Sequence, residues 1–169
     1  GNPGPVLNGA VRPGDNLFNN SIVALDARSG EYRWHFQQVH HDIWDYDSPN
    51  PIVLFEAEYG GRRRAGLVQV GKTGWAYILD RATGEPIWPI VERPVPQTDV
   101  PGEKTSPTQP FVTKPPPYSL NHLTENDLID FTPALRAQAL TNLRAPGGVR
   151  WEPTPFIPPT WAGPGGKWP

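Results

Sequence analysis

The sequence predicts an all-β protein made of short hairpins and long loops, on three observations. Twenty-three prolines and 17 glycines among 169 residues give the chain a composition rich in loops and turns. Seven tryptophans, six phenylalanines and five tyrosines argue against disorder, because they supply the apolar area that an ordered core needs. The third observation is a strand–turn–strand pattern that occurs twice.

The repeated pattern occupies residues 24–34 and 78–88. Gly30 aligns with Gly84, so the offset between the copies is 54. Each copy has an apolar strand, an Asp that can cap its own turn, a Gly suited to positive φ, a Glu and a strand that ends in Trp. A repeat of roughly 40 to 55 residues built from short strands has the size of a β-propeller blade.

The tryptophans that end the copies, Trp34 and Trp88, are expected to pack against neighbouring units. Between the copies, residues 51–58 and 66–70 have the composition of further strands, joined by a turn at 60–64, so that four strands fit one blade. The three arginines of this turn indicate a solvated hairpin tip rather than a phosphate clamp. Two unrelated hairpins with similar turns are the alternative, but five matching positions favour a true repeat.

The rest of the chain has a different character. Residues 91–118 are rich in proline, which predicts extended backbone without hydrogen-bonded ladders. Residues 124–127 resemble a capped helix start, and residues 133–144 carry apolar positions at helical spacing after a proline suited to a first turn. We therefore divide the chain into a blade region, a proline-rich excursion with one short helix, and the start of a further blade: residues 1–91, 92–150 and 151–169.

Charge and composition exclude several functions. Fifteen basic and 17 acidic residues give a net charge of −2, and no basic stripe alternates with aromatic residues, so no nucleic-acid partner is expected. No apolar run has the length of a membrane span, and residues 1–5 lack the features of a signal peptide, although one could precede them. The absence of cysteine removes disulfides and thiolate metal sites but selects no compartment.

The densest group of chemically versatile side chains lies in residues 39–47, which contain two histidines, three aspartates and two aromatic residues. A zinc or iron site is a poor fit, because adjacent His40 and His41 point to opposite sides of an extended chain. The aspartates suit either catalysis or the capping of turn amides, and the residues alone leave both interpretations open.

A second apparent motif is rejected. Residues 66–73 satisfy the pattern Gly, four residues, Gly-Lys-Thr that cradles phosphates before a helix. The four intervening residues are typical of a strand, however, and residues 75–79 are typical of another strand, so we expect a turn between strands. Nucleotide hydrolysis is therefore not expected.

Several segments together resemble the quinoprotein methanol, ethanol and glucose dehydrogenases. In order along the chain, the similar segments are residues 1–5, 12–16, 21–26, 41–47 and 71–74. Others are similar to the membrane glucose dehydrogenase branch, namely residues 92–97, 106–111 and 156–160. The family fold is an eight-bladed β-propeller, so the resemblance implies a fragment of about two four-stranded blades.

The resemblance also implies an activity. It predicts a periplasmic enzyme, free or with a membrane-associated parent, that oxidises an alcohol or sugar with pyrroloquinoline quinone (PQQ) and calcium. Its expected partners are the small-molecule substrate, a cytochrome or ubiquinone as electron acceptor, and the remaining blades of the propeller.

Three positions match functional residues of the family. Asn2 matches an asparagine whose side-chain oxygen binds calcium. Asp45 matches the base that takes the proton of the substrate hydroxyl, and we assign it a metal contact as well. Lys72 matches a residue that bonds the quinone oxygens. Asp47 occupies a position that is acidic in both lanthanide-using and glucose dehydrogenases, so a lanthanide is not excluded.

The resemblance is incomplete. The family's glutamate metal ligand, its stacking tryptophan and its vicinal disulfide would all precede Gly1, and Lys167 stands where the family has asparagine before tryptophan. We therefore expect the isolated chain to be inactive. The alternative is a non-catalytic propeller that acts as an interaction scaffold, which has no reason to keep Asn2, Asp45 and Lys72 together.

Overall fold

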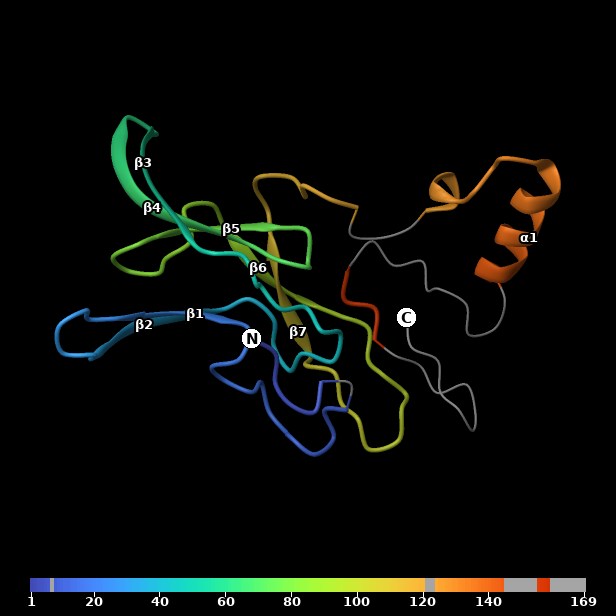
Figure 1. Cartoon of the computed structure of the whole chain (residues 1–169), viewed down its shortest axis with the longest axis horizontal. Coiled ribbons are helices and arrows are strands. Elements are labelled where there is room, and N and C mark those ends of the chain that lie inside the picture. Colours follow the sequence, from blue (N-terminus) through green and yellow to red (C-terminus); the bar gives the residue numbers. More distant parts are fainter. Residues whose placement is uncertain (7, 121–123, 145–154, 159–169) are drawn as a thin grey trace.

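The computed structural model describes residues 1–6, 8–120, 124–144 and 155–158 (Figure 1). Its strands form three antiparallel sheets with the orders β1-β2, β3-β4-β5 and β6-β7. The elements are β1 (Ser21–Leu25), β2 (Tyr32–Gln37), β3 (Val53–Tyr59), β4 (Arg62–Val70), β5 (Ala76–Asp80), β6 (Ile90–Pro94), β7 (Thr108–Val112), a 3-10 helix η1 (Glu125–Asp127) and α1 (Pro133–Arg144). The all-β class with a short helix is confirmed, although no sheet in the described part of the chain has the four strands expected of a whole blade.

The two copies of the repeat form the same turn. Asp26 Oδ1 accepts hydrogen bonds from the amides of residues 28 and 29, at 3.0 and 3.1 Å. Asp80 Oδ1 accepts the same pair of bonds in the second copy, at 2.8 and 3.2 Å. Gly30 and Gly84 follow with φ of 74° and 77°, a region that glycine adopts without steric cost.

After this turn the copies differ. The first copy continues into β2, which pairs along its length with β1. In the second copy the expected strand is reduced to a single bridge between Pro86 and Leu79 and one bond from the Ile87 amide to the Ile78 carbonyl. Pro86 stands where the first copy has Tyr32, and since proline has no amide hydrogen it cannot donate to a ladder.

The tryptophans of the repeat also have different environments. The ring of Trp34 is buried and lies on Gly84 of the other copy, where an added Cβ would be 2.5 Å from Trp34 Cε3. The prediction that this residue packs against a neighbouring unit is confirmed. Trp88 is only partly buried, donates a 2.7 Å hydrogen bond to the hydroxyl of Tyr59 and packs edge-on against its ring.

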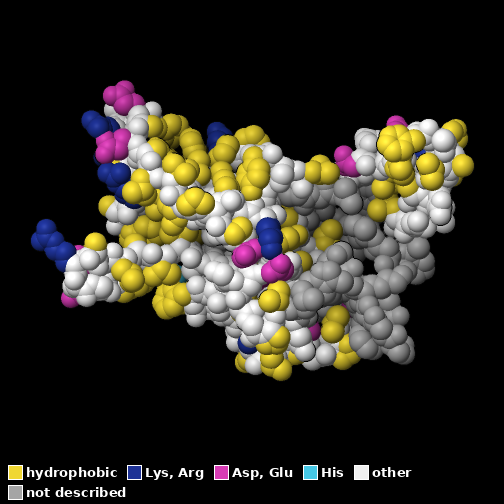
Figure 2. Space-filling model, viewed as in Figure 1, with side chains coloured by type: hydrophobic (Ala, Val, Ile, Leu, Met, Phe, Trp, Pro, Cys, Tyr) yellow, Lys and Arg dark blue, Asp and Glu magenta, His cyan; other side chains and the backbone are white. Residues whose placement is uncertain are grey.

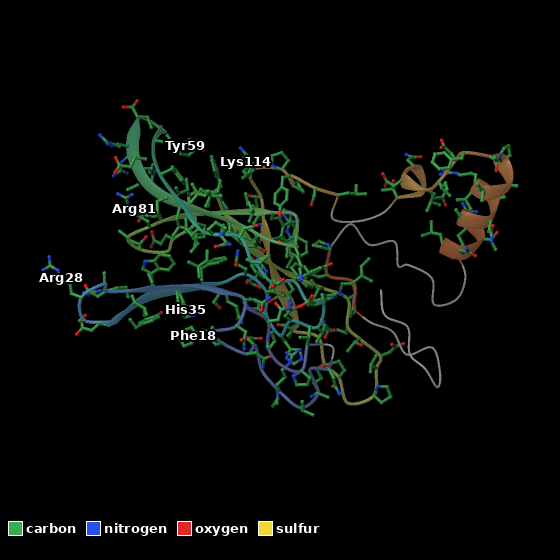
Figure 3. The ribbon with its side chains drawn as sticks, viewed as in Figure 1. Phe18, Arg28, His35, Tyr59, Arg81 and Lys114 are labelled. Atoms are coloured by element: carbon green, nitrogen blue, oxygen red, sulfur yellow. The ribbon has the colours of Figure 1, made fainter. Side chains whose placement is uncertain are left out.

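The β3–β4 hairpin has a tighter turn than expected. Only Gly60 and Gly61 lie between the strands, with φ of 61° and 69°, which suits a two-residue hairpin turn. The three arginines assigned to the turn belong to β4 instead, so the predicted bounds of the turn, residues 60–64, were wrong. From its position in the strand, Arg63 forms an ion pair with Glu56 on β3. Glu56 also forms an ion pair with Arg81 at 3.0 Å, and Figure 3 shows Arg81 near the hairpin.

The proline-rich segment was also predicted incorrectly. It contains a ladder in which β6 and β7 pair from Ile90–Val112 to Pro94–Thr108. A two-stranded sheet has an open edge on both strands, and proline is tolerated where no amide hydrogen is needed. The predicted helix over residues 133–144 is confirmed as α1, and Figure 1 shows it apart from the sheets. Within the described residues, no helix is long and apolar enough to span a bilayer.

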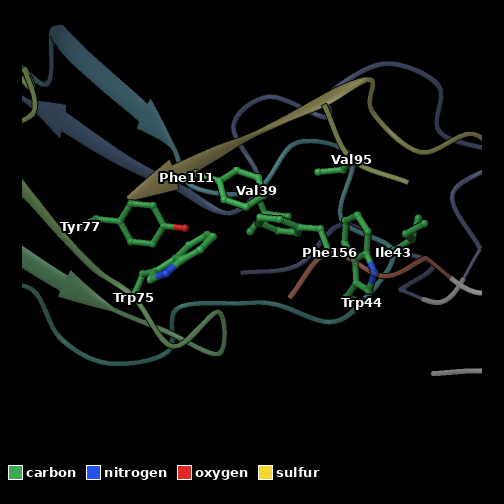
Figure 4. Packing of buried hydrophobic residues seen from close by; sticks show 8 residues of the cluster. All are labelled: Val39, Ile43, Trp44, Trp75, Tyr77, Val95, Phe111 and Phe156. Atoms are coloured by element: carbon green, nitrogen blue, oxygen red, sulfur yellow. The ribbon is translucent and has the colours of Figure 1, made fainter. Parts of the chain in front are cut away.

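The main core lies between the sheets and the loop after β2 (Figure 4). It contains eight buried residues: Val39, Ile43, Trp44, Trp75, Tyr77, Val95, Phe111 and Phe156. A second cluster joins the repeat copies through Ile22, Trp34, Leu67 and Leu79. Figure 2 shows hydrophobic side chains on the surface of the β1–β2 and β3–β4 hairpins. Leu25 on β1 and Leu54 on β3 are 58% and 61% exposed.

The segment at residues 155–158 completes this core. Phe156 is fully buried there, and the segment's carbonyls accept hydrogen bonds from the loop after β2. Trp44 Nε1 donates to Ile157 O at 2.7 Å, and Tyr46 Oη donates to Pro155 O at 2.7 Å. The rest of the region expected to start a further blade, including Lys167, lies outside the described residues.

Candidate active site

The three residues expected at the cofactor site come from distant parts of the sequence and meet in the structure. Asn2 lies at the start of the chain, Asp45 in the loop between β2 and β3, and Lys72 in the turn between β4 and β5. Lys72 Nζ lies 2.8 Å from Asp45 Oδ2, and Asn2 Nδ2 donates a hydrogen bond to Asp45 Oδ1. The side chains of Asp45 and Lys72 are 47% and 46% exposed, so small molecules can reach both.

Lys72 forms a second ion pair, with Asp47 Oδ1 at 2.7 Å. The hydrogen bond to Asp45 and then that to Asp47 raise the pKa of Lys72 above its usual value, so the ammonium is charged at neutral pH. The Lys72 amide also donates to the Asp47 carbonyl at 3.2 Å. Gly71 lies so close to Ser48 that a Cβ would clash with its hydroxyl. The turn and the loop are therefore packed together, and they fix the position of the ammonium.

The loop that carries Asp45 is held from inside by Asp42, which is 1% exposed. Its carboxylate accepts three hydrogen bonds of 2.9 Å, from the Trp44 amide, the Tyr46 amide and Asn20 Nδ2. Burial raises the pKa of Asp42, while these three hydrogen bonds act in the opposite direction. The sequence left catalysis and the capping of turn amides open for the aspartates of this loop, and the structure shows Asp42 in the capping role.

The donors at this site suit a hard cation in part. Asn2 Oδ1 is buried and accepts no hydrogen bond from the described residues, and it lies next to the Asp45 carboxylate. Oxygens of this kind are the ligands that calcium and lanthanides prefer. Within the described ranges there is no group of three His, Cys, Asp or Glu side chains that could hold a metal. Because calcium takes roughly six to eight oxygens, these residues fit a partial shell.

The adjacent histidines bind separate partners. His40 Nε2 lies 3.0 Å from Glu92 Oε1 on β6, whereas His41 Nε2 lies 3.1 Å from the buried Glu103. His41 Nδ1 is bonded to the Gly14 carbonyl at 2.7 Å. The pair thus attaches the loop to the proline-rich segment. A cleft of about 600 Å³ adjoins Glu103, but Asn2, Asp45 and Lys72 do not line it.

The apparent phosphate-binding motif has the structure expected of a turn between strands. Residues 66–70 belong to β4, and residues 71–74 turn into β5. No helix follows the Gly-Lys-Thr sequence, so its amides are not arranged to hold phosphates in front of a helix. The predicted turn between two strands is confirmed.

Comparison with known proteins identifies the family of the chain. Residues 1–164 match the family model "PQQ: Glucose/ethanol/alcohol dehydrogenase, beta-propeller domain". The glycerol dehydrogenase large subunit of Gluconobacter oxydans is 39% identical over 123 residues, which are 72% of this chain and 17% of that protein. The quinoprotein glucose dehydrogenase of Escherichia coli is 38% identical over 106 residues, which are 63% of this chain and 13% of that protein.

Among solved structures, the quinohemoprotein alcohol dehydrogenase of Comamonas testosteroni is 34% identical, with a TM-score of 0.47. That alignment covers 63% of this chain and 16% of the other chain. The chain thus spans less than a fifth of the length of each of these relatives. Because the family match covers nearly every residue, the chain belongs to the PQQ-dependent glucose/ethanol/alcohol dehydrogenase family and carries part of its β-propeller domain.

Proposed function

We propose that the chain forms part of a dehydrogenase that oxidises a hydroxyl group of an alcohol or an aldose with PQQ. The observation that carries this proposal is the contact between Asn2, Asp45 and Lys72, which lie up to 70 positions apart in the sequence (2 to 72). A base, a fixed ammonium and an amide oxygen that accepts no hydrogen bond within the described part of the chain suit oxidation at a metal-bound quinone. Family membership supports the same conclusion.

Each of the three residues has a distinct role in this proposal. When bound, PQQ supplies the acceptor for hydride from the substrate carbon, and calcium or a lanthanide supplies Lewis acidity. Asp45 takes the proton of the substrate hydroxyl, which its exposed carboxylate can reach. Lys72 donates hydrogen bonds to the quinone oxygens and counters negative charge. Asn2 Oδ1 and the Asp45 carboxylate provide oxygen ligands to the cation.

Asp47 fixes the ammonium of Lys72 from the other side. With one carboxylate on each side, Lys72 remains paired with Asp47 when Asp45 receives a proton. The ammonium then keeps its place during the proton transfer, which is the preorganisation that electrostatic catalysis requires.

The remaining parts of the proposal concern the whole protein. We place it in the periplasm, free or membrane-associated, with a cytochrome or ubiquinone as electron acceptor and with the other blades of the propeller completing the site. The relatives support a polyol or sugar as substrate, since their names specify glycerol and glucose. A non-catalytic scaffold is the second candidate. A titration of the complete parent protein with PQQ, followed by absorbance, separates the two, because only the enzyme gives a saturable change.

A chimaera tests the proposal in a complete propeller. The segment of the Escherichia coli glucose dehydrogenase that corresponds to residues 1–164 of this chain is replaced by those residues, and glucose-dependent reduction of an artificial electron acceptor is measured. Activity should require both added PQQ and calcium. Asp45→Asn should keep PQQ binding and lower turnover on the order of 10²- to 10⁴-fold, because an amide cannot take the proton.

The matched control is Glu58→Gln, which removes an exposed carboxylate on β3 and should leave turnover unchanged. Full turnover by the Asp45→Asn chimaera, or activity without quinone, would show that the proposed mechanism is wrong.

A further inference from the structure

The loop around Asp45 has an unusual backbone that needs support. Asp45 has a φ of 65° and His41 a φ of 44°, both in the left-handed region that residues other than glycine rarely adopt. Such conformations persist only where the surrounding structure enforces them, and they concentrate at functional sites. Some group must therefore hold the backbone on both sides of Asp45.

Asp42 is that group. Its Oδ1 accepts the Trp44 amide at 2.9 Å, and its Oδ2 accepts the Tyr46 amide at 2.9 Å, so the two bonds flank Asp45. Asn20 Nδ2 donates to the same Oδ2 at 2.9 Å and to the Tyr46 carbonyl at 3.1 Å. Both oxygens of a buried carboxylate are thus occupied by donors from the residues next to Asp45.

Only a carboxylate can satisfy this arrangement. An asparagine at position 42 would keep one oxygen and present an NH₂ group at the other place, where it would face N–H donors. Either the Trp44 amide or the Tyr46 amide would then lose its acceptor in a buried environment, which is costly. A glutamate would move the carboxylate by the length of one methylene group and misalign both bonds.

The side chains on either side of Asp45 are fixed as well. Trp44 and Tyr46 stack at 5.8 Å and donate to the carbonyls of Ile157 and Pro155. Their peptide groups and their rings are thus both held, and Asp45 is the exposed residue between them. We propose that Asp42 is a positioning residue that fixes the conformation in which Asp45 meets Asn2 and Lys72. This inference rests on the proposed role of Asp45 as the base.

The first test measures the loop in the 169-residue chain without cofactor. In Asp42→Asn, hydrogen exchange at the amides of Trp44 and Tyr46 should become faster on the order of 10- to 100-fold, since these amides lose a charged acceptor. The matched control is Gln109→Met. Gln109 is fully buried and makes two hydrogen bonds, of 2.9 and 2.7 Å, to the main chain of His40 in the same loop. Its loss should leave exchange at Trp44 and Tyr46 unchanged.

The second test measures kcat and KM in the chimaera described above. Asp42→Asn should lower kcat on the order of 10²-fold with little change in KM, because a base displaced by about 1 Å loses that much rate. Gln109→Met should keep kcat. Should Asp42→Asn fail to fold, Asn20→Ala removes one of the three donors and should give a smaller loss of kcat at constant KM.

The outcomes separate this inference from the proposed function. If Asp45→Asn abolishes turnover while the folded Asp42→Asn variant keeps the wild-type kcat, the positioning role is overturned and the proposed function stands. Equal losses of kcat in Asp42→Asn and Gln109→Met would also overturn it, because that result indicates general destabilisation. Should Asp45→Asn keep full turnover, the proposed function fails, whatever the exchange at Trp44 and Tyr46.

Discussion

Replacement of Phe156 by alanine tests the packing that holds the site loop. Phe156 is fully buried, and its ring packs against four others. The distances between ring centroids are 5.4 Å to Trp44, 6.0 Å to Tyr46, 5.8 Å to Trp75 and 5.7 Å to Phe111. The substitution therefore removes the one ring that contacts all the others in this group.

The expected loss of unfolding free energy follows from this environment. A buried Phe→Ala substitution costs about 3 to 5 kcal/mol, and a favourable aromatic pair adds about 0.5 to 1.5 kcal/mol beyond burial. With four such pairs we expect the upper end, about 4 to 5 kcal/mol. Domains of this kind have a total stability of about 5 to 15 kcal/mol, so the loss is severe. Phe131→Ala is the control, because Phe131 is 84% exposed and should change stability by less than about 0.5 kcal/mol.

Urea unfolding of the 169-residue chain measures both variants, with tryptophan fluorescence as the signal because two of the packed rings are tryptophans. The midpoint of Phe156→Ala should fall far below that of the wild type, while Phe131→Ala should coincide with it. If the two variants differ by less than about 1 kcal/mol, residues 155–158 do not pack in the core as described.

Three further predictions concern the turns and the isolated chain. Gly84→Ala should destabilise the chain more than Gly30→Ala in urea unfolding. The two glycines have similar φ values, 77° and 74°, but only a Cβ at residue 84 would contact Trp34. Equal losses of unfolding free energy would argue against that contact. The bond from Arg33, and then those from two turn amides, lower the pKa of Asp26 to about 2, so its stabilising effect should be complete above about pH 4 and disappear as the pH falls towards 2. The melting temperature of Asp26→Asn should therefore depend less on pH in that range, and an unchanged acid dependence would contradict this. The isolated chain should not bind PQQ with micromolar affinity in isothermal titration with excess calcium, since it supplies few of the ligands, and micromolar binding would refute that expectation.

Local features of the fold were predictable from the sequence. The Asp and Gly of each repeat determine their own turn through hydrogen bonds between neighbours, and α1 begins at a proline preceded by Thr132, whose hydroxyl accepts the Leu135 amide at 3.2 Å. The missed features depend on distant pairing. The ladder between β6 and β7 contradicts the local preference of a proline-rich segment, and only the partner strand makes it favourable. The short second strand of the repeat, by contrast, could have been anticipated from Pro86.

In the candidate site, too, local features were predictable from the sequence and contacts between distant residues were not. Asn2, Asp45 and Lys72 were identified by resemblance, and their contacts span 43 and 27 positions, which spacing alone does not reveal. Catalysis and amide capping were both left open for the three loop aspartates, and only its burial distinguishes Asp42 from the other two. Local chemistry thus predicts that an aspartate caps the loop amides, but it does not identify which of the three carboxylates is buried and which is exposed.

The attachment of the loop to residues 155–158 has a consequence during synthesis on the ribosome. Trp44 and Tyr46 find their carbonyl partners 113 and 109 positions later in the chain. At about 5 to 20 residues per second, translation needs on the order of ten seconds to cover that interval. In that time the nascent chain exposes the aromatic rings and the carboxylates of an unfinished loop, so the order of synthesis favours protection by a chaperone until the last of these partners has emerged.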